Sequence, residues 1–372
     1  MFRKHCQSIL FMIRYTSKTL WIHGVPPMIT ASPRRVTLKD IALACGYSAN
    51  TVSRALRDDK KLPEQTRLQI CQMAKEMGYV PNSSARTLRS GSSRTVAIIV
   101  NDINNPYYAN ILSQFDHLLQ EKDYRTMILC TQLSEDLASS MIQLAVSHMV
   151  DGILFFPFNN IRHIHELQAS GIPFVLIDRR VPNVEADIAR IDDFAAGQMQ
   201  TTHLLELGHR KFLYMAGPFV NSSQVDRQNG ITRALKDAGL DPDKHLRVIP
   251  WDAISAESTP AEIFDLLKPL DYTGILAFND MLAYHALTAL YSEGYHAPRD
   301  FSVVGIDHIR WRNTYLPQLT SIATANGQSV AQSAIELLFR RIEDPDTPYR
   351  HRVIPVRLHL DGTTGPVRNH SL

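Results

Sequence analysis

The chain has 372 residues and a formal net charge of +2, and its four cysteines are scattered without a CxxC pair. This length suffices for two or three domains. The cysteine spacing excludes the common zinc sites and fits a reducing compartment. No segment approaches the length of a membrane span, and we expect a cytoplasmic protein with no membrane partner.

The small net charge hides a strong asymmetry along the sequence. Residues 34–94 hold 12 Lys and Arg against 5 Asp and Glu, whereas residues 95–372 hold 23 against 32. A basic segment joined to an acidic body suggests that the first part contacts nucleic acid and the second does not.

The first 33 residues are basic and partly apolar. Arg14 interrupts the apolar run SILFMI and no cleavage site follows, so the segment lacks the features of a signal peptide. Either it is a flexible basic extension, or translation begins further along, at Met28. We expect residues 1–33 to be disordered or not translated.

Two short helices are predicted between Val36 and Leu56. Thr37 can cap the first helix, with Asp40 three residues later as in a capping box, and Gly46 can end it. Ser48 can cap the second helix. The two helices and the tight turn between them have the pattern of a helix-turn-helix.

The second of these helices presents a short, polar and basic face formed by Ala49, Asn50, Ser53 and Arg54. Such a face suits a helix that lies in the major groove of DNA. The alternative is an ordinary amphipathic hairpin with a solvated face.

A third helix is predicted next. Pro63 suits its first position, and Ile70, Ala74 and Met77 form an apolar stripe that would pack on the first two helices. The three helices together predict a DNA-binding headpiece over residues 34–81.

Residues 82–94 leave two alternatives open. The sequence Gly91-Ser92-Ser93 favours a flexible linker. The other interpretation is a short hinge helix, from Ser84 to Arg89, that orders only on DNA. Leu88 would then be an apolar residue in a basic surround, which is the composition of a minor-groove wedge.

From Thr95 onward, apolar runs alternate with helix-length segments. The runs are VAIIV, TMILC, GILFF, PFVLI, KFLYM, GILAF and SVVGI. Continuous apolar runs bounded by turns indicate buried parallel strands, so we predict a doubly wound α/β architecture. No GxGxxG follows the first strand, which disfavours a dinucleotide-binding fold.

Polar side chains follow several of these strands, where open α/β sheets bind ligands. They are Asn101, Asp102, Asp178, Arg179, Asn279, Asp280 and Asp307. We find no nucleophile–base arrangement and no metal-binding spacing, and we interpret His163 and His165 as surface residues. We therefore expect no catalysis, no metal and no cofactor.

A set of short motifs occurs along the chain in the order VTLKDIA, YSANTVSRAL, TRLQI, GYVPN, ARTLRSG, NDINNPYYA, LGHRKFLYMAGP, DRQNG, AFNDMLA and VVGIDH. From about Val36 to its C-terminus, the chain thereby resembles the lactose/purine repressor (LacI/GalR-type) family of bacterial transcription regulators. The resemblance implies an all-α helix-turn-helix headpiece with a hinge helix at residues 82–94. Residues 95–372 would form a two-lobed α/β body with parallel sheets, like the sugar-binding proteins of the bacterial periplasm.

The resemblance also implies how the body is divided. Three chain crossings would join the lobes, so that neither lobe is continuous, and a small molecule would bind between them. Residues from Thr95 to about Arg190 would form most of the first lobe, and the second lobe would run from there to about Asp307.

By the same resemblance, Asn50 and Arg54 would read bases, and Leu88 would be the intercalating residue of the hinge helix. Ala49 departs from the larger residues that are common at its position, which puts the operator sequence in doubt. The implied DNA-contacting residues are Thr37, Ser48, Ala49, Asn50, Thr51, Ser53, Arg54, Arg57, Asn82, Ala85, Arg86 and Leu88.

The resemblance implies a second set of residues around the small molecule, or effector. These are Asp102, Tyr107, Tyr108, Asp178, Arg179, Arg227, Asn279 and Asp307. Carboxylates, guanidinium groups and an amide around one cleft suit a polar or polyhydroxylated ligand. Arg227 would need a partner, because a buried charge without one is costly, and Arg179 would contact the ligand or pair with Asp178.

We therefore predict a DNA-binding transcription regulator that acts as a homodimer on a pseudo-palindromic operator. It would be a repressor controlled by a small-molecule effector, most often a sugar or sugar derivative in this family. The alternative is a ligand-binding receptor module without a DNA role, which would explain the body but has no use for the basic headpiece.

Overall fold

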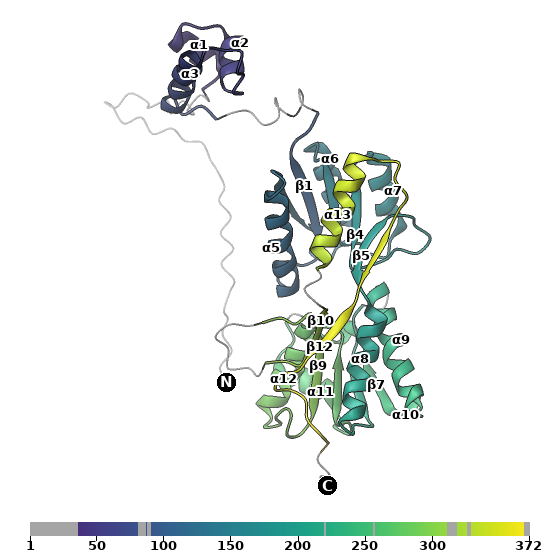
Figure 1. Ribbon diagram of the computed structural model, residues 1–372. Helices are drawn as coiled ribbons and strands as arrows, with labels where there is room; N and C mark the ends of the chain where they lie inside the picture. The colour runs from purple at the N-terminus through teal and green to yellow at the C-terminus, as the bar shows by residue number, and fades with distance from the viewer. Residues whose placement is uncertain are drawn as a thin grey trace, which may run out of the picture. The chain divides into compact units, whose positions relative to one another are not determined.

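A computed structural model describes most of the chain (Figure 1). The described residues are 36–80, 87, 91–218, 221–255, 257–310, 318–325 and 329–367. The predictions for residues 1–33 and for Asn82, Ala85, Arg86 and Leu88 lie outside them. The chain divides into two compact units after Asn82, so the described linker residues belong to the second unit.

The first unit contains α1 (Leu38–Cys45), α2 (Ala49–Ala55) and α3 (Glu64–Glu76). The capping box of Thr37 and Asp40 is confirmed, because each side chain bonds to the other's backbone N–H. Gly46 ends α1 with a φ of 73°, a left-handed conformation that glycine adopts without strain. Ser48 caps α2 by accepting the N–H of Thr51 at 3.1 Å.

A small apolar core holds the three helices together. Ile41, Val52 and Ile70, one from each helix, are fully buried in it. Pro63 lies one residue earlier than predicted: it occupies the N-cap position, without a side-chain cap, and α3 begins at Glu64. The proline has no backbone N–H to satisfy, so this position suits it equally well.

The second unit contains two six-stranded sheets. The first has the order β11-β5-β4-β3-β1-β2, and all its neighbouring strands are parallel. Its strands are β1 (Thr95–Val100), β2 (Arg125–Cys130), β3 (Gly152–Phe155), β4 (Phe174–Ile177), β5 (Asp187–Ile191) and β11 (His351–Ile354).

The second sheet has the order β12-β10-β9-β8-β6-β7, and only the pair of β10 and β12 is antiparallel. Its strands are β6 (Phe212–Met215), β7 (Leu246–Ile249), β8 (Gly274–Ala277), β9 (Ser302–Ile306), β10 (Ser321–Thr324) and β12 (Val356–His359). The predicted architecture of two parallel-rich α/β lobes is confirmed.

Helices cover both faces of each sheet (Figure 1). The first lobe has α5 (Pro106–Gln120), α6 (Glu135–Ser147), α7 (Ile161–Ser170) and α13 (Val330–Glu343). The second has α8 (Asp193–Glu206), α9 (Ser222–Asp237), α10 (Pro242–His245), α11 (Pro260–Leu267), α12 (Asp280–Ser292) and the 3-10 turn η1 (Trp251–Ala253). The strands are short and apolar, since helices on both faces keep water from them.

The chain passes between the two sheets three times, as predicted. It crosses after β5 at Asp192, between β10 and α13, and at Pro355 between β11 and β12. In Figure 1 the last crossing is the long yellow ribbon. The second lobe extends further than the predicted limit at Asp307, because β10 pairs with β9 in the second sheet.

Of the two histidines predicted at the surface, His165 is exposed and His163 is buried. His163 is 2% exposed, with Nε2 placed 3.0 Å from the carbonyl oxygen of Glu135, so its interpretation as a surface residue is wrong, whereas His165 is exposed. None of the helices in the described ranges has the length and apolar character needed to cross a bilayer.

Candidate functional site: a cavity between two lobes and a helix-turn-helix face

A cavity of about 510 Å³ lies where the carboxyl ends of the strands from both lobes meet. The first lobe contributes α5 and the residues that follow β4, and the second contributes the start of α8 and α9 and the residues that follow β8 and β9. Open α/β sheets bind ligands at this edge because loops and helix N-termini converge there.

Most of the predicted effector residues line this cavity. They are Tyr107, Tyr108, Asp178, Arg179, Arg227, Asn279 and Asp307. Asp102 does not line it: its carboxylate accepts the backbone N–H of Asn104 at 2.9 Å and so belongs to the turn that precedes α5. Asn105 caps this helix and Pro106 is its first residue.

Arg227 is the most constrained charged group in the cavity. Its Nε donates to Asp193 at 2.8 Å, its Nη1 donates to the carbonyl oxygen of Phe278, and its guanidinium lies 4.4 Å from the centroid of the Phe278 ring. Asp193 was not among the predicted residues. It is the first residue of α8, two positions after β5, and no sequence signal pointed to it because β5 itself was not recognised.

Two glycines set the distance between the helices that carry this ion pair. A Cβ on Gly197 of α8 would lie 2.0 Å from the carbonyl oxygen of Arg227, and a Cβ on Gly230 of α9 would lie 2.1 Å from that of Phe194. The backbones of α8 and α9 therefore touch, which places Asp193 within bonding distance of Arg227.

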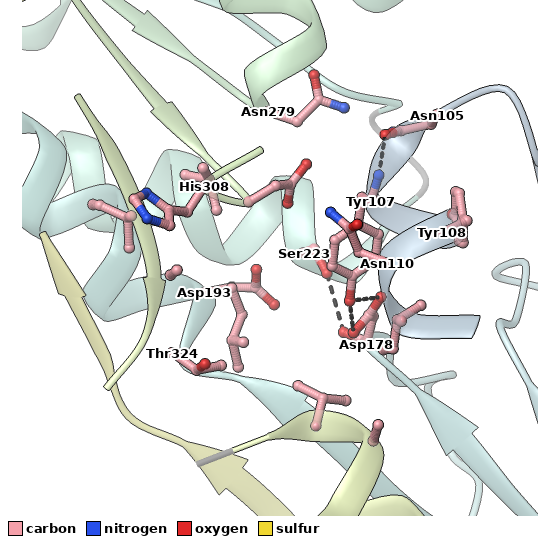
Figure 2. A pocket seen from close by; sticks show the side chains of 18 of the residues that line it. Asn105, Tyr107, Tyr108, Asn110, Asp178, Asp193, Ser223, Asn279, His308 and Thr324 are labelled. Carbon is pink, nitrogen blue, oxygen red and sulfur yellow. Dashed lines mark hydrogen bonds between the residues drawn. The ribbon is translucent and has the colours of Figure 1, made fainter. Parts of the chain in front are cut away.

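Asp178 follows β4 in the left-handed region, with a φ of 65°. Its two carboxylate oxygens accept the hydroxyl of Tyr107 at 2.8 and 2.7 Å, and its carbonyl oxygen accepts the hydroxyl of Ser223 at 3.1 Å, so it contacts both lobes (Figure 2). Burial raises the pKa of this carboxyl group to about 6, although the Tyr107 hydroxyl and the charge of Arg179 oppose the shift.

Arg179 turns toward the first lobe. Its Nη2 donates to the hydroxyl of Tyr108 and its Nη1 to the carbonyl oxygen of Pro157, both at 3.4 Å. The side-chain amide of Asn101 makes two hydrogen bonds when its NH₂ group faces the carbonyl oxygen of Phe156. In that orientation the amide oxygen accepts a hydrogen bond from Nη1 of Arg179 at 2.7 Å. The guanidinium is thus held by neutral groups and not by a hydrogen bond to Asp178, whereas contact with the ligand, the other alternative for this residue, stays a prediction.

Asn279 and Asp307 line the cavity from the second lobe. The Asn279 side-chain oxygen caps α12 by accepting the N–H of Leu282 at 3.0 Å. Asp307 has a φ of 120°, and burial together with the nearby Asp280 carboxylate raises its pKa well above the usual value. Asp280 is fully buried behind the cavity wall and accepts the Ser321 hydroxyl at 2.6 Å.

The predicted DNA-facing helix α2 has a mixed environment. Asn50 is exposed as expected, whereas Ala49 is half-buried against the core of the first unit. Arg54 donates from Nε to Asp59 at 2.8 Å, and the pair is about one-third exposed, with side-chain accessibilities of 36% and 31%. Arg57 donates to the carbonyl oxygen of Ser53 at 2.9 Å. In this structure Arg54 is therefore an ion-pair partner as well as a residue of the exposed face.

Two family models match separate parts of the chain. A model of the lacI family of bacterial regulatory proteins matches residues 37–82. A model of a periplasmic binding protein-like domain matches residues 201–364. The first match contains the headpiece helices, and the second contains Arg227, Asn279 and Asp307.

Individual relatives extend over most of the chain. It is 29% identical to the HTH-type transcriptional regulator DegA of Bacillus subtilis, over 78% of this chain and 86% of the relative. It is 26% identical to the HTH-type transcriptional repressor PurR of Mannheimia succiniciproducens, over 83% and 93%. Among solved structures, the transcriptional regulator CelR in complex with cellobiose has a TM-score of 0.61 and 25% identity, over 88% of this chain and all of that one.

Proposed function

We propose that this protein, which belongs to the lacI family of bacterial regulatory proteins, is a homodimeric repressor whose affinity for a pseudo-palindromic operator is controlled by a sugar bound between its lobes. The family consists of DNA-binding transcription regulators and not of enzymes. The dimer, the repressor role and the class of effector are the steps that go beyond family membership.

The carboxylates that line the cavity carry the proposal of a sugar. Asp178, Asp193 and Asp307 all face it, together with the amide of Asn279. Carboxylates accept hydrogen bonds from hydroxyl groups, and a sugar ring offers several donors. The complex of CelR with cellobiose supports the same class of ligand.

The charges argue further for an uncharged sugar. Arg227 is paired with Asp193, and Arg179 is held by Tyr108 and Pro157. The cavity is lined by three carboxyl groups, of Asp178, Asp193 and Asp307, against two guanidinium groups, of Arg179 and Arg227, so a phosphate or carboxylate group on the ligand would add to an excess of acidic groups in a buried site. Sugar phosphates and sugar acids should therefore bind poorly.

A thermal-shift screen tests the effector class. Neutral mono- and disaccharides including cellobiose, sugar phosphates, sugar acids and purine bases would be added at millimolar concentration to the wild type. A ligand present at 100 times its Kd stabilises by about 2.7 kcal/mol, which amounts to a shift of several degrees. We expect the shift with a neutral sugar, and a shift with phosphates, acids or purines alone would refute the proposal.

Single-residue variants test whether the sugar that causes the thermal shift binds in the cavity. Asp307→Asn keeps the size of the side chain and should abolish the shift, and Arg227→Ala should do the same if the variant folds. Arg233→Ala is the matched control, because Arg233 is on the same helix but is exposed and paired with Asp237. An unchanged shift in Asp307→Asn would place the sugar elsewhere.

DNA binding separates this proposal from a receptor module without a DNA role. The full-length protein should select sequences with two inverted half-sites from a random duplex pool, and its affinity should fall steeply with salt because several phosphates are neutralised. Asn50→Ala should lose the preference for the selected sequence. If the wild type binds no duplex at low salt, the receptor module is the correct interpretation.

A further inference from the structure

The segment from Gly91 to Arg94 is anchored, although its composition favours a flexible linker. Oδ1 of Asp151 accepts the backbone N–H of Ser93 at 2.8 Å and its hydroxyl at 3.0 Å. Oδ2 accepts the N–H of Arg94 at 3.1 Å and also the hydroxyl of Ser92. One carboxylate thus receives hydrogen bonds from three consecutive residues, which are hereafter called the clamped segment, Ser92–Arg94.

Neighbouring contacts tie the clamped segment into the first sheet. The backbone N–H of Asp151 donates to the carbonyl oxygen of Thr95 at 2.8 Å, and the N–H of Arg125 donates to that of Arg94 at 2.8 Å. The Arg94 guanidinium lies 5.2 Å from the centroid of the Tyr124 ring. Glycine and serine in this segment therefore permit a tight fit around a carboxylate, and the sequence pattern is not that of a free tether.

The clamp and the effector cavity lie at opposite ends of the same two strands. Strands β1 and β3 are hydrogen-bonded neighbours, with Val96 opposite Gly152, and they start at Thr95 and directly after Asp151. At their other ends are Asn101 and Pro157, which bond to the cavity residue Arg179. A pair of buried parallel strands is a stiff connection, so the clamped segment moves with the first lobe.

We propose that Asp151 is a positioning residue that fixes the point at which the chain leads from the effector-binding body to the DNA-binding headpiece. The inference rests on the proposed function, because it concerns how a change in the lobes reaches the DNA. Without the clamp, Gly91-Ser92-Ser93 would act as a flexible spacer and the two headpieces of a dimer would no longer be held at one separation. Specific binding to two half-sites depends on that separation, since it sets the effective concentration of the second headpiece.

Asp151→Asn tests the clamp directly. In the four hydrogen bonds that Ser92, Ser93 and Arg94 make to this carboxylate, the carboxylate is always the acceptor. An amide offers these donors only one oxygen and a repelling NH₂ group. Hydrogen–deuterium exchange of the full-length protein should show slow exchange at the Ser93 and Arg94 amides in the wild type and much faster exchange in the variant. Fast exchange of both amides in the wild type would overturn the proposal.

The functional measurement compares two DNA duplexes, one selected by the wild type from a random pool and one with a scrambled sequence. The quantity measured is the ratio of the protein's affinities for the selected and the scrambled duplex. We expect Asp151→Asn to lower this ratio at least about tenfold while affinity for the scrambled duplex stays within about twofold, because each headpiece is intact and only the joint placement is lost. Asp116→Asn is the control: its carboxylate also accepts two side-chain hydrogen bonds in the first lobe, from Thr126 and Gln120, and both donors lie outside the clamped segment.

The positioning role is supported if the affinity ratio falls in Asp151→Asn while Asp151→Asn and Asp116→Asn melt at the same temperature. If Asp151→Asn also melts far below Asp116→Asn, the double variant Ser92→Ala/Ser93→Ala carries the test, because it removes two hydroxyl donors and leaves the carboxylate in place. An unchanged ratio in a folded clamp variant overturns the inference alone. A wild type that does not distinguish the two duplexes overturns the proposed function with it.

Discussion

Arg227 on α9 donates from Nε to the carboxylate of Asp193 on α8 at 2.8 Å, and the two side chains are only 8% and 1% exposed. The pair forms a wall of the effector cavity. Its charges neutralise each other where water is largely excluded, so neither residue can be changed alone without leaving a buried charge. The same pair thereby shapes the cavity and holds α8 against α9.

Removing one partner should be costly for stability. In Asp193→Ala the Arg227 guanidinium stays buried without its anion, and we expect the free energy of unfolding of the body to fall by about 3–5 kcal/mol. Asp193→Asn retains one acceptor oxygen and should lose less. Urea denaturation of the two variants checks the order, and a loss under about 1 kcal/mol in Asp193→Ala would show that the pair is dispensable.

The close contact between α8 and α9 predicts that a substitution at Gly197 weakens sugar binding indirectly. In Gly197→Ala the new methyl group would meet the Arg227 carbonyl oxygen at 2.0 Å, so α8 and α9 must move apart. Overpacking of this kind costs about 1–3 kcal/mol, and the displaced Arg227 should weaken sugar binding. Gln198→Ala, one residue further along α8, is the control for thermal melting and for sugar titration by calorimetry. Equal behaviour of the two variants would contradict the close-packing argument.

The sequence predicts the strands that form continuous apolar runs, the edge strand β2 included, but not the strands that polar residues interrupt. β3 and β4 are buried throughout and were recognised as runs of apolar residues. β5 was missed because it begins with Asp187, a fully buried carboxylate that Arg341 binds at 2.8 Å. That partner is supplied by α13, more than a hundred residues away, and local patterns contain no trace of it. β7 and β12 were missed because Arg247 and Arg357 interrupt their short apolar runs.

The pKa of Asp178 predicts that sugar binding depends on pH. Burial raises this pKa to about 6 in the folded protein, above about 3.9 in the unfolded chain. The folded state therefore binds the extra proton between about pH 4 and pH 6, and stability falls as the pH rises through that window and is level above it. A sugar hydroxyl that donates to the ionised carboxylate competes with that proton.

The contribution of Asp178 to sugar affinity should consequently be constant above about pH 7 and weaken about tenfold between pH 7 and pH 5, since the proton must then be displaced. His308 also lines the cavity, but burial lowers its pKa to about 4, so it stays neutral across this range. Asp178→Asn should remove the dependence. Calorimetric titration at several pH values measures it, and a wild-type affinity that is level from pH 7 to pH 5 would rule out an ionised Asp178 as a ligand contact.

Local sequence patterns predict only part of the candidate site, as they predict only part of the fold. The strand-end positions of Asp178, Asn279 and Asp307 follow from the apolar runs before them, and all three line the cavity. Asp193 follows a strand that was not recognised, so it was not considered. Arg54 was recognised on its helix face, but its ion pair with Asp59 depends on the turn after α2 and was not expected.

That ion pair predicts an unusual gain of DNA affinity. The Arg54 guanidinium lowers the pKa of Asp59 through a hydrogen bond, so at neutral pH the carboxylate is ionised and competes with DNA phosphates and bases for the same arginine. In Asp59→Asn the arginine is released toward DNA. We expect tighter non-specific binding and a salt slope that is steeper by about 0.9, the value for one additional phosphate contact.

Asp58→Asn separates release of the arginine from a simple change of charge. Asp58 is the neighbouring carboxylate, is 70% exposed and pairs with Arg67 at 2.8 Å, so its substitution removes the same charge and releases Arg67 but leaves Arg54 bound to Asp59. Fluorescence anisotropy with a scrambled duplex at several salt concentrations should show the steeper slope in Asp59→Asn alone, and Arg54→Ala should cancel it in the double variant. Equal slopes in the two single variants would mean that the headpiece responds only to its net charge and that Asp59 does not restrain Arg54.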